Sequence, residues 1–164
     1  MGKTAVIAAA ALAMALAVAA TGCATARDAG GAAQAAASAD SALSGTWVTR
    51  DGAMISFDGG NWTEYFPGGE PYLMGMFTAE GGIIFMTVTQ VSGSFMSLML
   101  GIDAEPRWHS LDEMRDIFVE IMAEYGIPAE AAAEYFDHRF GPFSTTYSVS
   151  GDDLALGGEV LSRL

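Results

Sequence analysis

Closely spaced turn motifs divide the first half of the chain into short segments, and this spacing limits the possible folds more than any other feature. The motifs are Asp51-Gly52, Asp58-Gly59-Gly60, Pro67-Gly68-Gly69 and Glu80-Gly81-Gly82. Such runs provide the positive φ angles that tight β-turns require. The segments between them are too short for ordinary helices, so we expect an antiparallel meander.

The segments between these turns have the residue pattern of strands. They are rich in aromatic and β-branched residues, and alternation places Ile55 with Phe57 and Leu73 with Phe77 on shared faces. We predict five strands, over residues 45–50, 53–57, 61–66, 72–78 and 83–91.

Helical spacing replaces the strand pattern within residues 92–140. Ser110 and Glu113 form a capping box, and apolar residues then recur at helical intervals up to Gly126. Pro128 opens a second, shorter helix. We therefore predict a two-helix insertion at about residues 92–140.

The strand pattern returns at Phe143, and the turns Gly151-Asp152 and Gly157-Gly158 separate three final strands. Eight short antiparallel strands must protect their edges, and closure into a barrel does this most completely. We predict a mainly β (β+α) fold. In it, an up-and-down meander closes into a small barrel of about eight strands, with the helical insertion before the last three.

Two segments of the predicted barrel domain, residues 45–164, resemble a known family. Gly45-Thr46-Trp47 and residues 147–156 are similar to the lipocalin-like domains found in bacterial lipoproteins. The resemblance implies that Trp47 packs its indole across the closed end of the barrel. The insertion departs from this family, because a true lipocalin carries its helix after the barrel.

The N-terminus has the features of an export signal. Lys3 precedes an uncharged apolar stretch, and Ala20-Thr21-Gly22-Cys23 resembles the lipobox of bacterial lipoproteins, although that family prefers Leu at the position of Ala20. The resemblance implies a signal peptide over residues 1–22 and a diacylglyceryl group on Cys23. The alternatives are an ordinary cleaved signal peptide and an uncleaved membrane helix.

Residues 23–44 follow as an Ala/Ser/Gly-rich segment without an aromatic residue, which predicts a flexible tether. The lipobox resemblance implies an exported protein anchored to a bacterial membrane and facing the periplasm or the cell exterior. Ala24, in place of an Asp, favours the outer membrane where one exists.

The chain is strongly acidic, with 20 Asp and Glu against seven Lys and Arg. Cleavage before Cys23 would leave six arginines against the same 20 acids, a net charge of −14. This charge argues against nucleic-acid binding and against attachment to anionic headgroups. The lipid bilayer is therefore expected to be a partner only through acylated Cys23.

An apolar run at residues 95–100, predicted as a sixth strand or a loop, and the first helix lie outside the barrel pattern. Both are placed to cover a barrel mouth, and methionine suits a loosely specified apolar ligand. The candidate ligand or mouth contacts are Phe95, Met96, Leu98, Met99, Met114 and Phe118. The alternative is that these residues simply fill the core.

Catalytic signals are weak. His109 and His138 are the two histidines, and neither has a Cys or His at metal-ligand spacing. We predict no catalytic, cofactor or metal site, and no enzyme. The leading hypothesis is a binding module for a small apolar or amphipathic ligand. The alternatives are an envelope interaction protein whose acidic exterior meets a basic partner and, more remotely, a cryptic hydrolase.

Overall fold

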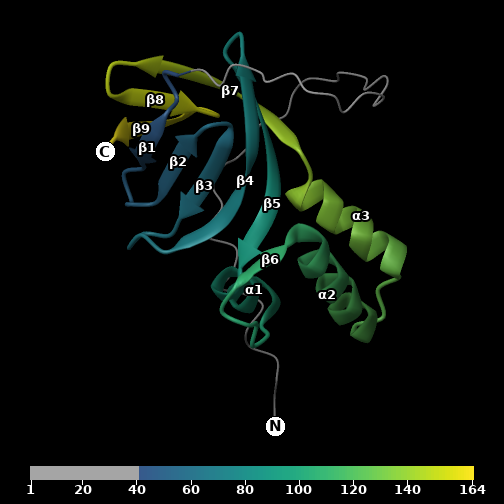
Figure 1. Cartoon of the computed structure of the whole chain (residues 1–164). Helices are drawn as coiled ribbons and strands as arrows, with labels where there is room; N and C mark the ends of the chain where they lie inside the picture. Colours follow the sequence, from purple (N-terminus) through teal and green to yellow (C-terminus); the bar gives the residue numbers. More distant parts are fainter. Residues whose placement is uncertain (1–40) are drawn as a thin grey trace.

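A computed structural model describes residues 41–164 (Figure 1). The elements are β1 (Gly45–Val48), β2 (Met54–Asp58), β3 (Asn61–Tyr65), β4 (Pro71–Glu80), β5 (Ile83–Ser92), α1 (Gly93–Leu100), β6 (Trp108–Ser110), α2 (Leu111–Glu124), α3 (Ala129–Phe140), β7 (Phe143–Ser150), β8 (Asp153–Leu156) and β9 (Glu159–Arg163). The signal peptide, Cys23 and most of the tether lie outside the described residues.

The sheet closes into a barrel of eight antiparallel strands. Its order is β1, β2, β3, β4, β5, β7, β8 and β9, with β9 paired back to β1. Every neighbour is the next barrel strand along the chain, which is the up-and-down topology of lipocalin-like barrels. The prediction of five strands, a helical insertion and three strands is confirmed.

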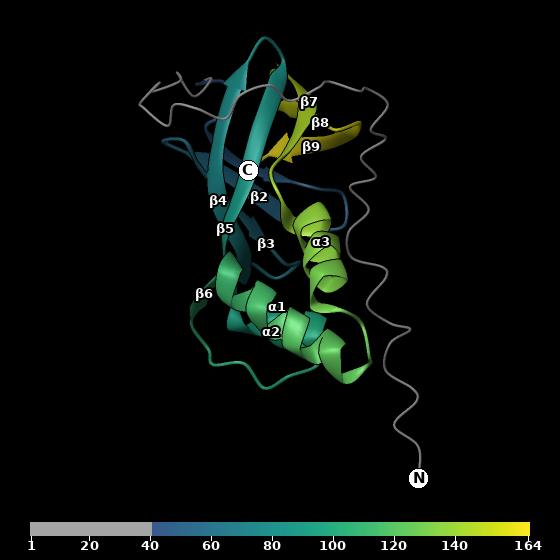
Figure 2. The ribbon, with the colours of Figure 1, turned by 90° about the vertical axis from the view of Figure 1, so that its right-hand side faces the viewer.

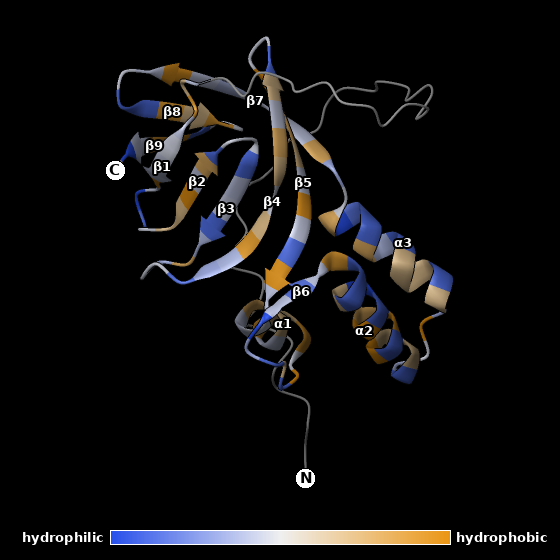
Figure 3. Ribbon diagram, viewed as in Figure 1, coloured by the Kyte–Doolittle hydropathy of each residue, from blue (hydrophilic) through white to orange (hydrophobic). Residues whose placement is uncertain are grey.

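Alternation along each strand fills the barrel interior. The register pairs Trp47 with Ile55 and Phe57 with Trp62, and all four are buried. Figure 3 shows the corresponding alternation of apolar and polar positions along β5. Directly paired residues share a face, so this register identifies the inward-facing residues of each strand.

Two ends of the barrel are distinguished by what covers them. The Trp47 end holds the start of β1 and the end of β9, and Trp47 is fully buried there. Its Nε1 donates to the main-chain oxygen of Leu43 at 2.8 Å, and the Arg163 guanidinium lies 4.1 Å from the centre of its ring. The insertion end is the other one, where β5 leaves the barrel and β7 returns to it.

Residues 95–100 form a helix, so the expectation of a sixth strand or a loop is wrong. Ser92 caps α1, because its Oγ accepts from Phe95 N, and Gly101 ends the helix at a positive φ of 68°. These local bonds satisfy the backbone of α1 without a neighbouring strand. The extra pairing with β5 falls instead to β6, so the insertion has three helices and a strand.

The other two helices begin close to where the sequence predicts them. Ser110 caps α2 by accepting from Glu113 N, and α3 follows Pro128. In both views of the ribbon, α1 and α2 lie beyond the lower ends of β4 and β5, with α3 beside α2 (Figure 1, Figure 2). Within residues 41–164, no helix is long and apolar enough to cross a membrane.

Candidate functional site

A glutamate faces the interior of the barrel at the insertion end. Glu64 on β3 pairs with Ile55 on one side and with Leu73 on the other, and both neighbours are buried on the inner face. Glu64 itself is half-buried. A carboxylate among apolar side chains loses hydration, so it needs compensating contacts.

Tyr72 supplies one such contact, because its hydroxyl donates to Oε2 of Glu64 at 2.6 Å. Burial raises the pKa of the Glu64 carboxyl, and the hydrogen bond from Tyr72 opposes part of this rise. The pKa of the Tyr72 hydroxyl is also raised, first by burial and then by the neighbouring carboxylate. The pair is thus a polar centre in apolar surroundings.

Aromatic rings surround this pair on the side of the insertion. Tyr72 is stacked between Phe66, at 4.3 Å between ring centres, and Phe95 of α1, at 5.3 Å. Phe95 in turn meets Phe140 of α3 edge-on at 6.3 Å. This row of rings connects β4 to the helices and fixes the position of the Tyr72 hydroxyl.

The interior is less tightly filled along β7 than along β4 and β5. Phe143 and Thr145 face inward, because they pair with buried Met86 and Ile84. All four inward residues of β7 are nevertheless only half-buried, whereas Ile84 and Met86 are buried. The inner face of β7 is therefore covered less completely than that of β5.

A second carboxylate lies on the interior face at the insertion end. Glu159 at the start of β9 pairs with inward-facing Leu156 and is half-buried. We call the interior surface at this end the mouth, and define it by Glu64, Leu73, Phe143 and Glu159. Around the closed barrel, β3 is three strands away from β7 in one direction and three strands away from β9 in the other. Glu64 therefore faces β7 and β9 across the interior.

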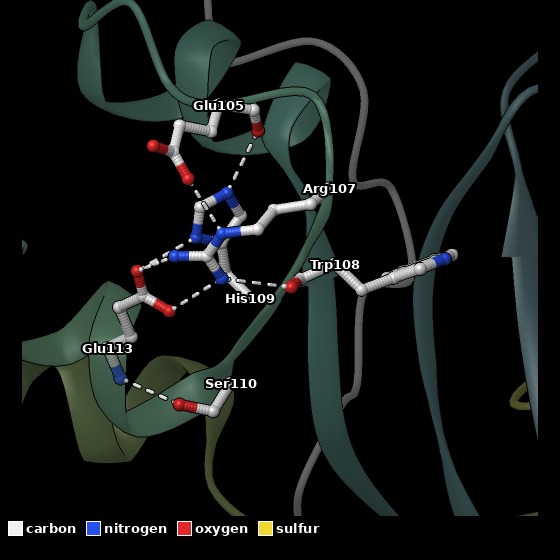
Figure 4. A network of polar contacts seen from close by, with 6 residues as sticks. All are labelled: Glu105, Arg107, Trp108, His109, Ser110 and Glu113. Atoms are coloured by element: carbon white, nitrogen blue, oxygen red, sulfur yellow. Dashed lines mark hydrogen bonds and ion pairs between the residues drawn. The ribbon is translucent and has the colours of Figure 1, made fainter.

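A polar network fixes the insertion beside the mouth (Figure 4). Arg107 donates through Nη2 and Nη1 to the two carboxylate oxygens of Glu113, at 2.6 and 3.1 Å, and through Nε to Glu105 at 2.8 Å. The pKa of Glu113 is lowered to about 2, chiefly by its hydrogen bonds from Arg107. The network joins the loop before β6 to the first turn of α2.

His109 belongs to the same network and is buried. Its Nε2 lies 3.0 Å from the main-chain oxygen of Glu105, which can only accept, so Nε2 is the donor. Its Nδ1 lies 3.0 Å from Oε1 of Glu113, with an alignment too poor for a hydrogen bond. Both ring nitrogens therefore face fixed oxygens of the network, and this arrangement holds the ring in place.

His138 lies in a shallow, open depression of about 580 Å³ between α2 and α3. Its other lining residues are Arg115, Glu130, Ala133, Glu134 and Asp137. Arg115 donates to both oxygens of Asp137, at 2.7 and 2.8 Å. No serine lines this depression, so it lacks the set of groups that the hydrolase hypothesis requires.

Three of the candidate contacts lie in the core, because Phe95, Met96 and Met114 are at most 2% exposed. Met99 and Phe118 are half-buried, and Leu98 on the outer side of α1 is 58% exposed. Phe95 alone among the six stacks on Tyr72. The structure therefore distributes these residues over the insertion and does not gather them at the mouth.

Sequence reasoning missed Glu64, Tyr72 and Glu159. A signal for Glu64 was present, since it follows Trp62 by two residues and so falls on the same face of the predicted strand. Within residues 41–164, no three His, Cys, Asp or Glu side chains gather in a way that could hold a metal ion.

No protein-family model matches the chain, and no curated protein matches it. Two crystal structures are similar to it. One is of an uncharacterized protein from Bacteroides eggerthii, with a TM-score of 0.41 and 12% identity over 74% of this chain and 99% of that one. The other is of a lipocalin-like protein from Bacteroides uniformis, with a TM-score of 0.38 and 13% identity over 75% and 99%.

The strand order itself defines the class of protein: a lipocalin-like, closed eight-stranded up-and-down barrel. Small barrels of this kind either fill their interior with side chains or hold one small ligand. Here the Trp47 end is filled, and at the mouth Leu73 is buried while Glu64, Phe143 and Glu159 are half-buried. This architecture is typical of a binding module.

Proposed function

We propose that this protein is a membrane-anchored, extracytoplasmic binding module whose barrel mouth takes a small apolar or amphipathic ligand. One observation carries the proposal: the inward side chains of β7 are only half-buried in a closed barrel, whereas Ile84 and Met86 on the neighbouring β5 are buried. Apolar surface that stays accessible to water in a concave site gains free energy when a ligand covers it.

The distribution of packing supports a ligand at the mouth and not deep in the barrel. Trp47, Phe57 and Trp62 are each at most 1% exposed, so the interior near the Trp47 end has no room for a ligand. All four inward residues of β7 are half-buried, and Phe143 and Thr145 are the two nearer the insertion end. A ligand would therefore lie along β7 and reach toward β3.

The test is a titration with the apolar fluorophore N-phenyl-1-naphthylamine. Thr145→Phe adds a ring to the inner face of β7, and we expect the affinity for the fluorophore to fall about tenfold or more. Ser144→Phe adds the same ring to the exposed outer face of the same strand and should bind as the unchanged protein does. Equal affinity in both variants, or no binding by the unchanged protein, would contradict the proposal.

The proposed anchor is the lipidated Cys23, supported by the lipobox-like sequence Ala20-Thr21-Gly22-Cys23. Cys23→Ala should move the protein from the membrane fraction to the soluble fraction, since its acidic surface offers no second attachment to anionic lipid. Cys23→Ser replaces the thiol with a hydroxyl of similar size and should also move the protein to the soluble fraction. Membrane retention of both variants would refute the anchor.

A second candidate function is binding of a basic envelope protein. Residues 41–164 carry 18 Asp and Glu against five Arg, and the α2–α3 depression is lined by Glu130, Glu134 and Asp137. Such a surface predicts association that weakens as salt is added. Cross-linking in cells, followed by purification at low and high salt, tests it. A partner retained equally at both salt concentrations would count against this candidate.

A further inference from the structure

We propose that the ligand of the mouth carries a cationic head group, such as a primary ammonium, which binds the carboxylate of Glu64 while its apolar tail lies along β7. This inference rests on the proposed binding function and specifies the chemical class of the ligand. Three features of residues 41–164 support it: an oxygen of Glu64 that no described hydrogen bond reaches, the lack of an arginine paired with Glu64, and the second carboxylate of the mouth.

Glu64 has an unused acceptor. Tyr72 donates to Oε2, and none of the side-chain hydrogen bonds described within residues 41–164 reaches Oε1. Glu64 as a residue is half-buried and not fully enclosed. An ammonium approaching through the mouth therefore finds an oxygen already held in position by the Tyr72 hydroxyl.

Within residues 41–164, Glu64 forms no ion pair with an arginine. Arg107 and Arg115 bind Glu113 and Asp137 on the helical insertion. Arg163 lies at the opposite end of the barrel, where it covers Trp47 and donates to the main-chain oxygens of Ser44 and Ala42. No salt bridge described within residues 41–164 neutralises an ionised Glu64, and a cationic ligand would supply a counter-charge.

The surroundings of the mouth disfavour an anionic ligand. Glu159 places a second carboxylate on the interior face at the same end, and the described chain has 18 acidic residues against five arginines. A fatty-acid carboxylate would meet repulsion there, whereas an alkylammonium would be attracted from solution. The apolar part of the mouth, with Leu73 and Phe143, accepts the apolar tail of either ligand, so the head group decides between them.

The experiment uses the full chain loaded with N-phenyl-1-naphthylamine and displaces this neutral fluorophore with octylammonium, 1-octanol or octanoate. At about pH 8 the amine remains protonated, because its pKa is close to that of lysine. We expect octylammonium to displace the fluorophore about 10- to 100-fold more effectively than 1-octanol, with octanoate the weakest, as one charge-assisted hydrogen bond predicts.

Glu64→Gln should remove the preference for octylammonium over 1-octanol. Glu80→Gln is the matched control, since it removes the same charge from an exposed position at the Trp47 end and should keep the preference. Fluorophore binding by each variant shows that its mouth is intact.

The two proposals fail in different ways. Absence of fluorophore binding by the unchanged protein overturns the binding function itself. Fluorophore binding with equal displacement by all three octyl compounds, or an ammonium preference that survives Glu64→Gln, overturns only the cationic ligand. Loss of the preference in both Glu64→Gln and Glu80→Gln attributes it to overall charge, and this also overturns the role of Glu64.

Discussion

Replacing Glu64 with Gln should stabilise the protein at neutral and alkaline pH and leave its stability at acid pH unchanged. The pKa of Glu64 is raised in the folded state by burial. In the unfolded chain it returns to the ordinary value of 4.5. As the pH rises above this value, the unfolded state loses its proton first, so the free energy of unfolding falls until Glu64 ionises in the folded state as well.

The magnitude follows from two opposing contributions. Desolvation of a carboxylate costs several kcal/mol in a protein interior. The hydrogen bond from Tyr72 to a charged acceptor returns about 1.5–3 kcal/mol. A Gln amide oxygen accepts the same hydrogen bond without carrying a charge. At a pH well above the folded-state pKa of Glu64, we therefore expect Glu64→Gln to raise the free energy of unfolding by about 1–2 kcal/mol.

Urea unfolding followed by tryptophan fluorescence, repeated from about pH 4 to pH 9, measures this difference directly. Glu80→Gln serves as the control, because Glu80 is exposed and its substitution should give a difference near zero throughout. A Glu64→Gln difference that is independent of pH, or a variant less stable than the unchanged protein at high pH, would refute the reasoning.

Three further predictions concern the barrel and its insertion. Glu113→Gln should lower the free energy of unfolding at neutral pH. In urea titrations this loss should shrink as the pH falls below 4.5 and disappear near pH 2, because Glu113 of the unchanged protein is then protonated in the folded state as well. Gly75→Ala should lower the free energy of unfolding by about 3 kcal/mol or more in thermal unfolding, because the added Cβ would clash with the main-chain oxygen of Thr87. Gly59→Ala is the control, because the space around Gly59 is open, and it should lower the free energy of unfolding clearly less. Equal losses in the two variants would exclude the clash. Trp47→Phe should lower the free energy of unfolding by about 1–3 kcal/mol, because the hydrogen bond to the main-chain oxygen of Leu43 is lost. An unchanged thermal-unfolding midpoint would show that this bond is unimportant.

The strands and most of the helices were predictable, because their signals are local. Turn glycines and two-residue alternation predicted the barrel strands, and Ser110 as a capping residue predicted the start of α2. The run at 95–100 was not predictable as a helix from its apolar pattern. Its decisive signals were Ser92 and Gly101, the capping residues at its two ends.

The mouth was only partly predictable. Alternation from Trp62 could place Glu64 on an inner face, but it could not provide the Tyr72 hydroxyl, since the register of β3 and β4 shifts between Glu64 and Tyr65. The stacking of Phe95 on Tyr72 depends on how α1 packs against β4 and β5. Such contacts arise from the relative position of elements and leave no trace in the spacing of residues.

The sequence alone therefore determined the number and order of the barrel strands, the position of the insertion and the acidic charge, all of which depend on neighbouring residues or on composition. The tertiary structure alone decided that Phe95, Met96 and Met114 fill the core while Glu64 and Glu159 lie at the mouth. Closure of the barrel is the physical reason, because it brings β9 against β1 and turns one face of every strand toward a shared interior.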